Sequence, residues 1–188
     1  MRGIGETRAV VTTVGSHDTA SAVVAVPSTD PDVAYISCGT WSLVGIELER
    51  PVLTEESRLA GFTNEGGVDG RVRYLHNVMG LWLLSESIRD WERTGETISL
   101  PALLAQAASA RADVPVFDAD DEAFLAPGDM PARIAAWFTE RGIEPPASRP
   151  ELVRSILQSL ADAYARAIEN ASRLSGKPVN AIHLVGGG

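Results

Sequence analysis

Two titratable residues, His17 and Asp18, stand side by side in the stretch TTVGSHDTASAVVAVP, directly after a glycine and before a short apolar run typical of a helix. A carboxylate at a helix start can act as a general base, accepting the proton of a substrate hydroxyl beside the positive end of the helix dipole. The position also suits a helix cap, because Ser16, Asp18 and Thr19 carry side-chain oxygens that satisfy free backbone N–H groups. The spacing alone leaves both interpretations open, and caps are the commoner of the two. His17 can hydrogen-bond a hydroxyl-rich ligand or pack in the interior.

Two glycine-containing stretches follow strand-like runs, and their glycines have no side chain to keep a ligand from the main chain. In SCGTWS, residues 37–42, Gly39 allows close approach to the main chain, and its N–H and the Thr40 hydroxyl can contact phosphate oxygens. In LVGGG, residues 184–188, Gly186 and Gly187 suit the close approach of a phosphate or a flat ring. Either stretch can equally be a turn that needs glycine for backbone reasons alone. The second matches neither the dinucleotide-binding fingerprint nor the phosphate loop that ends in Lys-Ser or Lys-Thr.

Asn77 is a third polar position, within YLHNVMGLWLLSES. It stands between a strand-like run and a helical run, where an asparagine serves as a helix cap or as a contact for a substrate. Trp82 and Trp91 fall on or near the apolar face of the following helix, so we expect them in the core.

The first half of the chain carries the β signals. The runs 32–39 and 41–49 are separated only by a glycine turn and predict a hairpin. A third run, 70–77, follows the turn signal NEGGVDG and extends the hairpin to a three-strand antiparallel meander. Residues 9–14 predict one more strand, ahead of the apolar helix that we expect to reach Val26.

Helical periods dominate from residue 79 onward. Residues 79–95 repeat apolar side chains at helical spacing, and the alanine-rich run 100–112 predicts a second helix. Residues 113–128 carry prolines and carboxylates without a sustained period, which predicts a surface connection. A short helix is expected over 133–141.

The best-marked element is a long helix in the last quarter of the chain. Ser148 with Glu151 three residues later forms a capping box, and Gly176 supplies the stop. Between them, one apolar face predicts burial against the rest of the domain; it consists of Leu152, Ile156, Leu160, Tyr164, Ile168 and Leu174. This helix leads into a strand over 179–185.

Composition narrows the class of protein. The chain has 188 residues, 45% of them hydrophobic, which is enough to bury a substantial core. A formal charge of −9 with scattered carboxylates argues against nucleic acid or an anionic membrane as the main partner. One cysteine, no zinc-ligand spacing and an N-terminus without the apolar core of a signal peptide favour a cytoplasmic protein.

Five motifs taken together resemble one family. GSHDTASAV, YISCGTWSLVG, FTNEGG, LHNVMGLWLL and IHLVGGG occur in the order and at about the spacing of the FGGY carbohydrate kinases, most of all those that phosphorylate L-rhamnulose. The resemblance covers essentially the whole chain. It implies an α/β fold of the ribonuclease H-like type found in actin and hexokinase, with an active site between two such domains. Because the matched part is central to C-terminal and the chain runs out in a glycine turn, residues 186–188, we expect residues 1–188 to be a partial C-terminal domain.

The resemblance also implies roles for the candidate residues. Asp18 would be the base that takes the proton from the sugar hydroxyl, and His17, Thr19 and Asn77 would contact the sugar. The residues implied at the ATP are Gly39, Thr40, Ser85, Gly186 and Gly187. Ser85 stands where the family often has a glutamine, so that contact would be shorter. The implied cofactors are ATP and Mg²⁺, and the Mg²⁺ ligands would come mainly from the N-terminal domain.

Other functions stay open on the sequence. A sibling kinase for xylulose, fuculose or another polyol would keep Asp18 and Thr40 and differ in the residues that line the sugar. A non-catalytic, actin-like module would bind ATP without phosphoryl transfer. A hydrolase that pairs His17 with a nearby serine is disfavoured, because adjacent residues at a helix start rarely face each other as nucleophile and base. Without its partner domain, the chain is expected to be inactive on its own.

Overall fold

A computed structural model describes residues 17–187, with Asp18 and Thr19 as main chain only. The strand predicted over 9–14 and the last of the three terminal glycines lie outside the described residues. In chain order the elements are α1 (Asp18–Val24), β1 (Val33–Cys38), β2 (Ser42–Leu48), α2 (Glu55–Leu59), β3 (Phe62–Gly66), η1 (Val68–Gly70), β4 (Val72–Val78), α3 (Trp82–Arg93), α4 (Leu100–Ser109), η2 (Glu122–Phe124), α5 (Met130–Glu140), α6 (Arg149–Ser175) and β5 (Ala181–Gly186).

The five strands form one mixed sheet in the order β3-β4-β2-β1-β5. β2 pairs antiparallel with both β1 and β4, which confirms the predicted hairpin and meander. β5 pairs parallel with β1 at one edge of the sheet, and β3 pairs antiparallel with β4 at the other. The β3 strand corrects the prediction of a turn from Asn64 onward. Its first residue, Phe62, stacks on Tyr74 of β4 with 4.7 Å between ring centroids, a long-range contact that the local sequence does not reveal.

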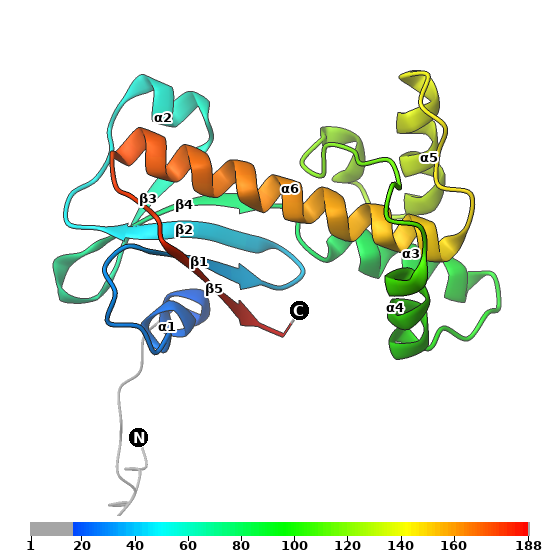
Figure 1. The fold of residues 1–188 in the computed structure, drawn as a ribbon, viewed down its shortest axis with the longest axis horizontal. Helices are drawn as coiled ribbons and strands as arrows, with labels where there is room; N and C mark the ends of the chain where they lie inside the picture. Colours follow the sequence, from blue (N-terminus) through cyan, green and yellow to red (C-terminus); the bar gives the residue numbers. More distant parts are fainter. Residues whose placement is uncertain (1–16, 188) are drawn as a thin grey trace, which may run out of the picture.

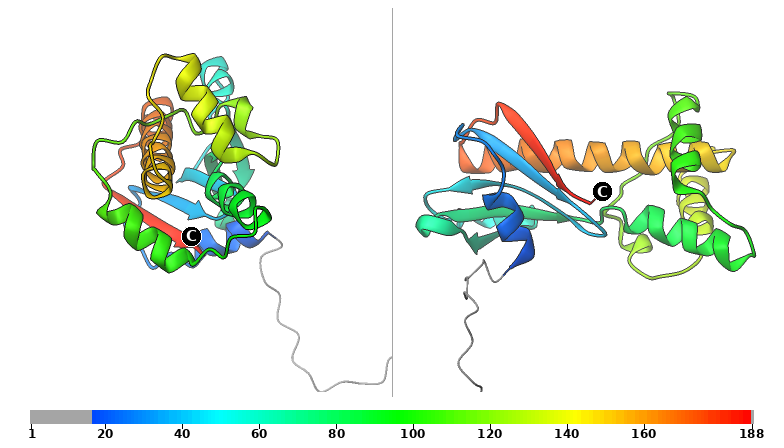
Figure 2. Two further views of the ribbon diagram at one scale, coloured as in Figure 1. Left: turned by 90° about the vertical axis from the view of Figure 1, so that its right-hand side faces the viewer. Right: turned by 90° about the horizontal axis from the view of Figure 1, so that it is seen from below.

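The helices α6 and α1 lie on opposite faces of this sheet (Figures 1 and 2). α6 covers β2 and β4. Alternate strand residues face it and form the core, together with the inner side of the helix; they are Ala34, Ile36, Cys38, Val44, Ile46, Tyr74 and Val78. The shorter α1 contacts β1 and β5 on the other face.

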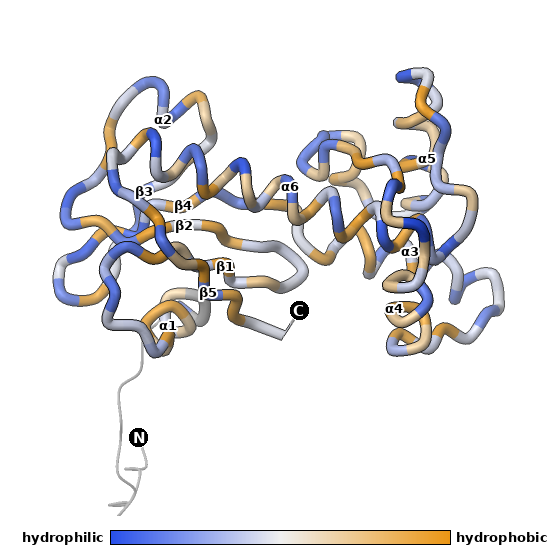
Figure 3. Tube along the Cα trace, viewed as in Figure 1, coloured by the Kyte–Doolittle hydropathy of each residue, from blue (hydrophilic) through white to orange (hydrophobic). Residues whose placement is uncertain are grey.

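A second group of helices, α3, α4 and α5, gathers around the N-terminal half of α6, beyond one end of the sheet (Figure 1). The connection over 113–128 belongs to this group, and the prediction that it merely crosses the surface is wrong in part. Phe117 and Phe124 are almost fully buried. They pack edge to face with 5.1 Å between their ring centroids, so this irregular segment supplies core as well as connection. In Figure 3, apolar residues mark the strands and the helical group, whereas the turns at the far end of the sheet are hydrophilic.

The predicted long helix is confirmed as α6. The Ser148 hydroxyl accepts a hydrogen bond from the Glu151 N–H, and the Glu151 carboxylate accepts one from the Ala147 N–H. Gly176 ends the helix with a left-handed φ of 73°. Among the described residues, neither this helix nor any other combines the length and the apolar character needed to cross a membrane.

Candidate active site at the carboxyl ends of three strands

Three strands end at the same edge of the sheet. β1 and β5 are parallel, and β4 runs in their direction because both β1 and β4 are antiparallel to β2. The glycine turn after β1, Asn77 near the end of β4, and Gly186 at the end of β5 therefore lie along one edge. In α/β sheets, ligands bind outside the carboxyl ends of the strands. Three stretches that are far apart in the sequence thus share one rim with the start of α3, visible in Figure 1 between the sheet and the helical group.

The turn between β1 and β2 is held from the helix side. The N–H of Leu81 donates to the carbonyl of Gly39, and the N–H of Trp82 donates to the carbonyl of Thr40, both at 2.9 Å. Gly80 makes this approach possible, because a Cβ there would lie 2.7 Å from the Thr40 carbonyl oxygen. The backbone at Gly80 also has a left-handed φ of 63°. The turn is consequently fixed, while the Thr40 side chain is exposed.

The end of β5 packs on the end of β1. Gly186 pairs with Cys38, and a Cβ on Gly186 would come within 2.2 Å of the Cys38 carbonyl oxygen. Gly187 has open space around it within 4 Å of the same hypothetical atom. The first glycine is thus required by strand packing, whereas the second offers bare backbone at the rim.

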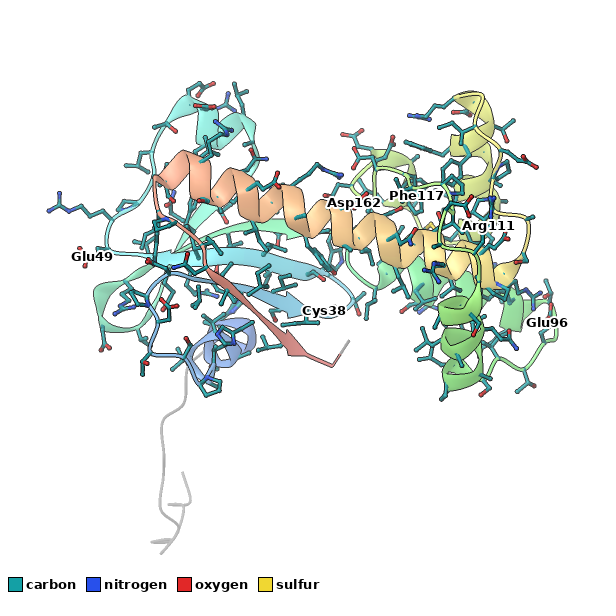
Figure 4. The ribbon with its side chains drawn as sticks, viewed as in Figure 1. Cys38, Glu49, Glu96, Arg111, Phe117 and Asp162 are labelled. Carbon is teal, nitrogen blue, oxygen red and sulfur yellow. The ribbon has the colours of Figure 1, made fainter. Side chains whose placement is uncertain are left out.

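Tyr164 of α6 contacts the two residues that flank the turn between β1 and β2. Its hydroxyl lies 2.7 Å from the Ser42 hydroxyl and 3.7 Å from the Cys38 sulfur, the two residues on either side of the turn. Burial raises the pKa of Tyr164 to about 12, so the hydroxyl keeps its proton. Figure 4 labels Cys38 at this end of the sheet. The helical period places Tyr164 on the apolar face of its helix but does not assign its hydroxyl a partner.

Asp120, from the irregular segment before η2, supports the junction between β4 and α3. One carboxylate oxygen accepts a hydrogen bond from the Met79 N–H at 2.9 Å. The other lies 4.0 Å from Nε2 of His76, whose Nδ1 lies 3.1 Å from the Gly61 carbonyl oxygen. The Asp120 contact raises the pKa of His76, partly offset by burial of the ring. No local pattern indicates this pair, since 44 positions separate the two residues.

The candidate residues His17, Asp18 and Thr19 lie at the N-terminus of α1. His17 is the N-cap, and its Nδ1 accepts a hydrogen bond from the Ala20 N–H at 3.3 Å. Asp18 is the first residue of the helix, so the cap position itself belongs to His17. The side chains of Asp18 and Thr19 lie outside the described residues, and the roles predicted for them stay predictions.

The remaining candidates are accessible. Asn77 and Ser85 are both exposed, Asn77 on β4 and Ser85 in the first turn of α3. Their contacts to sugar and nucleotide stay predictions. Among the side chains that the structure describes, three or more His, Cys, Asp or Glu residues nowhere gather closely enough to hold a metal ion. The rim therefore offers main-chain groups and the Thr40 hydroxyl, which are suited to contacts with the phosphate oxygens of a nucleotide. Its described side chains form no ligand cluster for Mg²⁺.

Comparison with known proteins agrees with this geometry. Residues 34–188 match the C-terminal domain of the FGGY family of carbohydrate kinases. A rhamnulokinase from Bacteroides thetaiotaomicron is 42% identical over 178 residues, which cover 95% of this chain and 36% of that protein. The chain thus spans little more than a third of its relative.

Solved structures show the same fold at low sequence identity. The xylulose kinase from Rhodospirillum rubrum superposes with a TM-score of 0.60 at 18% identity, covering 86% of this chain and 31% of that one. The xylulose kinase from Bifidobacterium adolescentis gives a TM-score of 0.51 at 17% identity, covering 85% and 30%. Together with the mixed five-strand sheet, these matches confirm the predicted α/β, ribonuclease H-like fold. The chain belongs to the FGGY family of carbohydrate kinases, and residues 34–188 correspond to its C-terminal domain.

Proposed function

We propose that the chain is the C-terminal part of an ATP-dependent kinase that converts L-rhamnulose to L-rhamnulose 1-phosphate. The observation that carries the proposal is the rim shared by the Gly39–Thr40 turn, Asn77 and Gly187, in a chain of the FGGY family. L-rhamnulose is preferred to xylulose or fuculose because the relative at 42% identity is a rhamnulokinase, whereas the xylulose kinases share 17–18% identity. Residues 1–188 would be a partial domain, completed by an N-terminal domain that the chain does not include.

Phosphoryl transfer asks little covalent chemistry of a protein. It needs the acceptor hydroxyl in line with the γ-phosphoryl group, stabilisation of the charge that develops, and a group to receive the proton. In this proposal the Thr40 hydroxyl and the Gly39 N–H bind phosphate oxygens on a turn that two backbone hydrogen bonds already fix. The turn loses little conformational entropy on binding, because it is ordered before the ligand arrives.

Four residues are proposed to act on the sugar, one of them as the base. Asp18 accepts the proton of the sugar hydroxyl as the oxygen attacks phosphorus. His17, Thr19 and Asn77 orient the sugar through hydrogen bonds to its other hydroxyls. Gly186, Gly187 and Ser85 lie against the nucleotide.

Bound Mg²⁺ supplies charge neutralisation between the phosphates. As the resemblance to the family implies, its ligands would come mainly from the N-terminal domain. The partners are small molecules, and a cytoplasmic location is expected for an enzyme that uses ATP.

The test is sugar-dependent ADP release by the full-length protein that contains this chain. L-rhamnulose is compared with xylulose, fuculose and glycerol at equal concentration. Release with L-rhamnulose well above the other three supports the proposal. A preference for xylulose or fuculose would reassign the substrate within the family. ATP binding without release for any sugar would identify a nucleotide-binding module and refute the kinase function.

A further inference from the structure

The start of α3 and the turn between β1 and β2 depend on each other. Leu81 stands at the N-cap of α3, where an apolar side chain cannot accept a hydrogen bond from the free N–H groups of the first turn. The N–H groups of Leu81 and Trp82 donate instead to the carbonyls of Gly39 and Thr40, both at 2.9 Å. The place of the turn is therefore set by the point at which the chain leaves β4 and enters α3.

Asp120 holds that point from the irregular segment before η2. Its carboxylate accepts a hydrogen bond from the Met79 N–H at 2.9 Å, and Met79 is buried with 2% of its surface exposed. A second contact comes from the same segment, since the carbonyl of Phe124 accepts a hydrogen bond from the ring N–H of Trp82 at 3.1 Å. The two contacts lie on either side of Gly80, so the junction between β4 and α3 is held at both ends.

The segment that carries Asp120 is itself anchored to two helices. Asp118 accepts a hydrogen bond from the guanidinium of Arg166, on α6, at 3.4 Å. Asp121 accepts one from the ring N–H of Trp137, on α5, at 2.8 Å. Asp120 lies between these two anchored residues, so its carboxylate is fixed independently of the junction that it contacts.

We propose that Asp120 is a positioning residue for ATP, which acts through Met79 and the start of α3 on the turn of Gly39 and Thr40. This inference rests on the proposed function, in which the Gly39 N–H and the Thr40 hydroxyl bind phosphate oxygens. Their contribution depends on where the turn lies, because a misplacement of about 1 Å in a binding group can cost about 10²-fold even when its cause is distant. Asp120 touches no substrate in this account, and its effect passes through main-chain hydrogen bonds alone.

The experiment is an equilibrium titration of the full-length protein with ATP, in the absence of sugar. Asp120→Ala leaves the Met79 N–H without its acceptor, and we expect the Kd for ATP to rise by about 10-fold or more. Asp120→Asn keeps an acceptor oxygen, so the Kd should stay within about 2-fold of the wild-type value. The loss of a negative charge would by itself favour an anionic ligand, so weaker binding in Asp120→Ala runs against the charge effect.

Glu151→Ala is the matched control for a general loss of stability. The Glu151 carboxylate also accepts a hydrogen bond from a main-chain N–H, that of Ala147 at 2.8 Å, but it lies in the first turn of α6. This variant should lose stability in urea unfolding and keep the wild-type affinity for ATP. An equal rise in Kd for Glu151→Ala and Asp120→Ala would overturn the inference, as would an Asp120→Asn variant that binds ATP as weakly as Asp120→Ala.

A Thr40→Ala background tests whether Asp120 acts through the turn. There, the further change Asp120→Ala should weaken ATP binding clearly less than it does in the wild-type protein, because part of what Asp120 positions is already gone. Strictly additive losses would overturn the inference. A protein that binds ATP but phosphorylates no ketose would refute the proposed function, and the titration would still decide the role of Asp120. A protein that binds no ATP would refute both.

Discussion

The hydroxyl of Tyr164, on α6, lies 2.7 Å from the hydroxyl of Ser42, the first residue of β2. This contact joins the helical layer to the turn that we propose for phosphate binding. Tyr164→Phe removes only the hydroxyl and leaves the fully buried Ser42 side chain without that partner. We expect the free energy of unfolding to fall by about 1–3 kcal/mol, the cost of an unsatisfied buried polar group. Urea unfolding of the chain measures this change.

The Ser42→Ala variant gives the matched test of the same contact. Removing both hydroxyls in Ser42→Ala/Tyr164→Phe should cost clearly less than the sum of the two single changes, because neither polar group is then left unpaired. Strictly additive losses would show that the two hydroxyls do not depend on each other and would contradict the proposed support of the turn.

A comparison of alanine variants at Gly80 and Gly142 distinguishes the cost of backbone strain from the cost of a steric clash. Gly80→Ala places a Cβ 2.7 Å from the Thr40 carbonyl oxygen at a φ of 63°. Gly142 has a similar φ of 69° with open space around it, so Gly142→Ala carries the strain without the clash. We expect Gly80→Ala to lose about 1–3 kcal/mol more stability than Gly142→Ala, the usual range for overpacking. Equal losses of stability in urea unfolding would show that the turn between β1 and β2 moves to accommodate the extra methyl group, and would contradict its proposed rigidity.

His76 and Asp120 predict a pH-dependent stability. The pKa of His76 in the folded protein is raised, first by the contact with Asp120, so the folded chain binds a proton more tightly than the unfolded chain does. The extra stability is therefore fully present below the ordinary value of 6.5 and is lost as the pH rises through the folded pKa. Relative to His76→Gln, the wild-type chain should be more stable near about pH 5.5 than near about pH 8.5.

Asp120→Asn is the control for this pair. The amide oxygen can still accept the hydrogen bond from the Met79 N–H, while the charge that raises the pKa of His76 is gone. In the Asp120→Asn variant, the cost of the further substitution of His76 should differ clearly less between the two pH values, because only the backbone contacts with Gly61 and Ala60 still raise the pKa of His76. An undiminished difference would show that Asp120 is not the main cause.

Local signals explain which elements the sequence predicts. α6 is recognised from Ser148, Glu151 and Gly176, which satisfy the helix ends within a few residues of the chain. The hairpin of β1 and β2 follows from alternating residues around one glycine turn. Both elements depend on contacts between near neighbours, so the pattern of the chain contains them.

Long-range contacts explain what the sequence does not reveal. β3 contains Asn64 and Gly66, which favour turns, and it forms because β4 pairs with it and Phe62 stacks on Tyr74. The buried Phe117 lies in a segment without periodicity, and its main-chain N–H donates to the Ser159 hydroxyl 42 positions away. Such contacts follow from the fold and carry no local pattern.

The candidate site likewise contains residues that sequence motifs identify and residues that only the structure reveals. Resemblance to the family identified Thr40, Asn77 and Gly187, and the strand directions gather them at one rim. The supporting residues Tyr164 and Asp120 act through side-chain contacts with segments more than 40 positions distant, which no motif contains.

We propose that the full-length protein that contains this chain transfers a phosphoryl group from ATP to L-rhamnulose with Asp18 as the base. The most direct measurement is L-rhamnulose-dependent turnover of the full-length enzyme beside its Asp18→Asn variant. Asparagine is nearly isosteric but accepts no proton, so we predict a turnover lower by roughly 10²–10⁴-fold, with the unfolding midpoint unchanged. Wild-type turnover in the variant would contradict the assignment of Asp18.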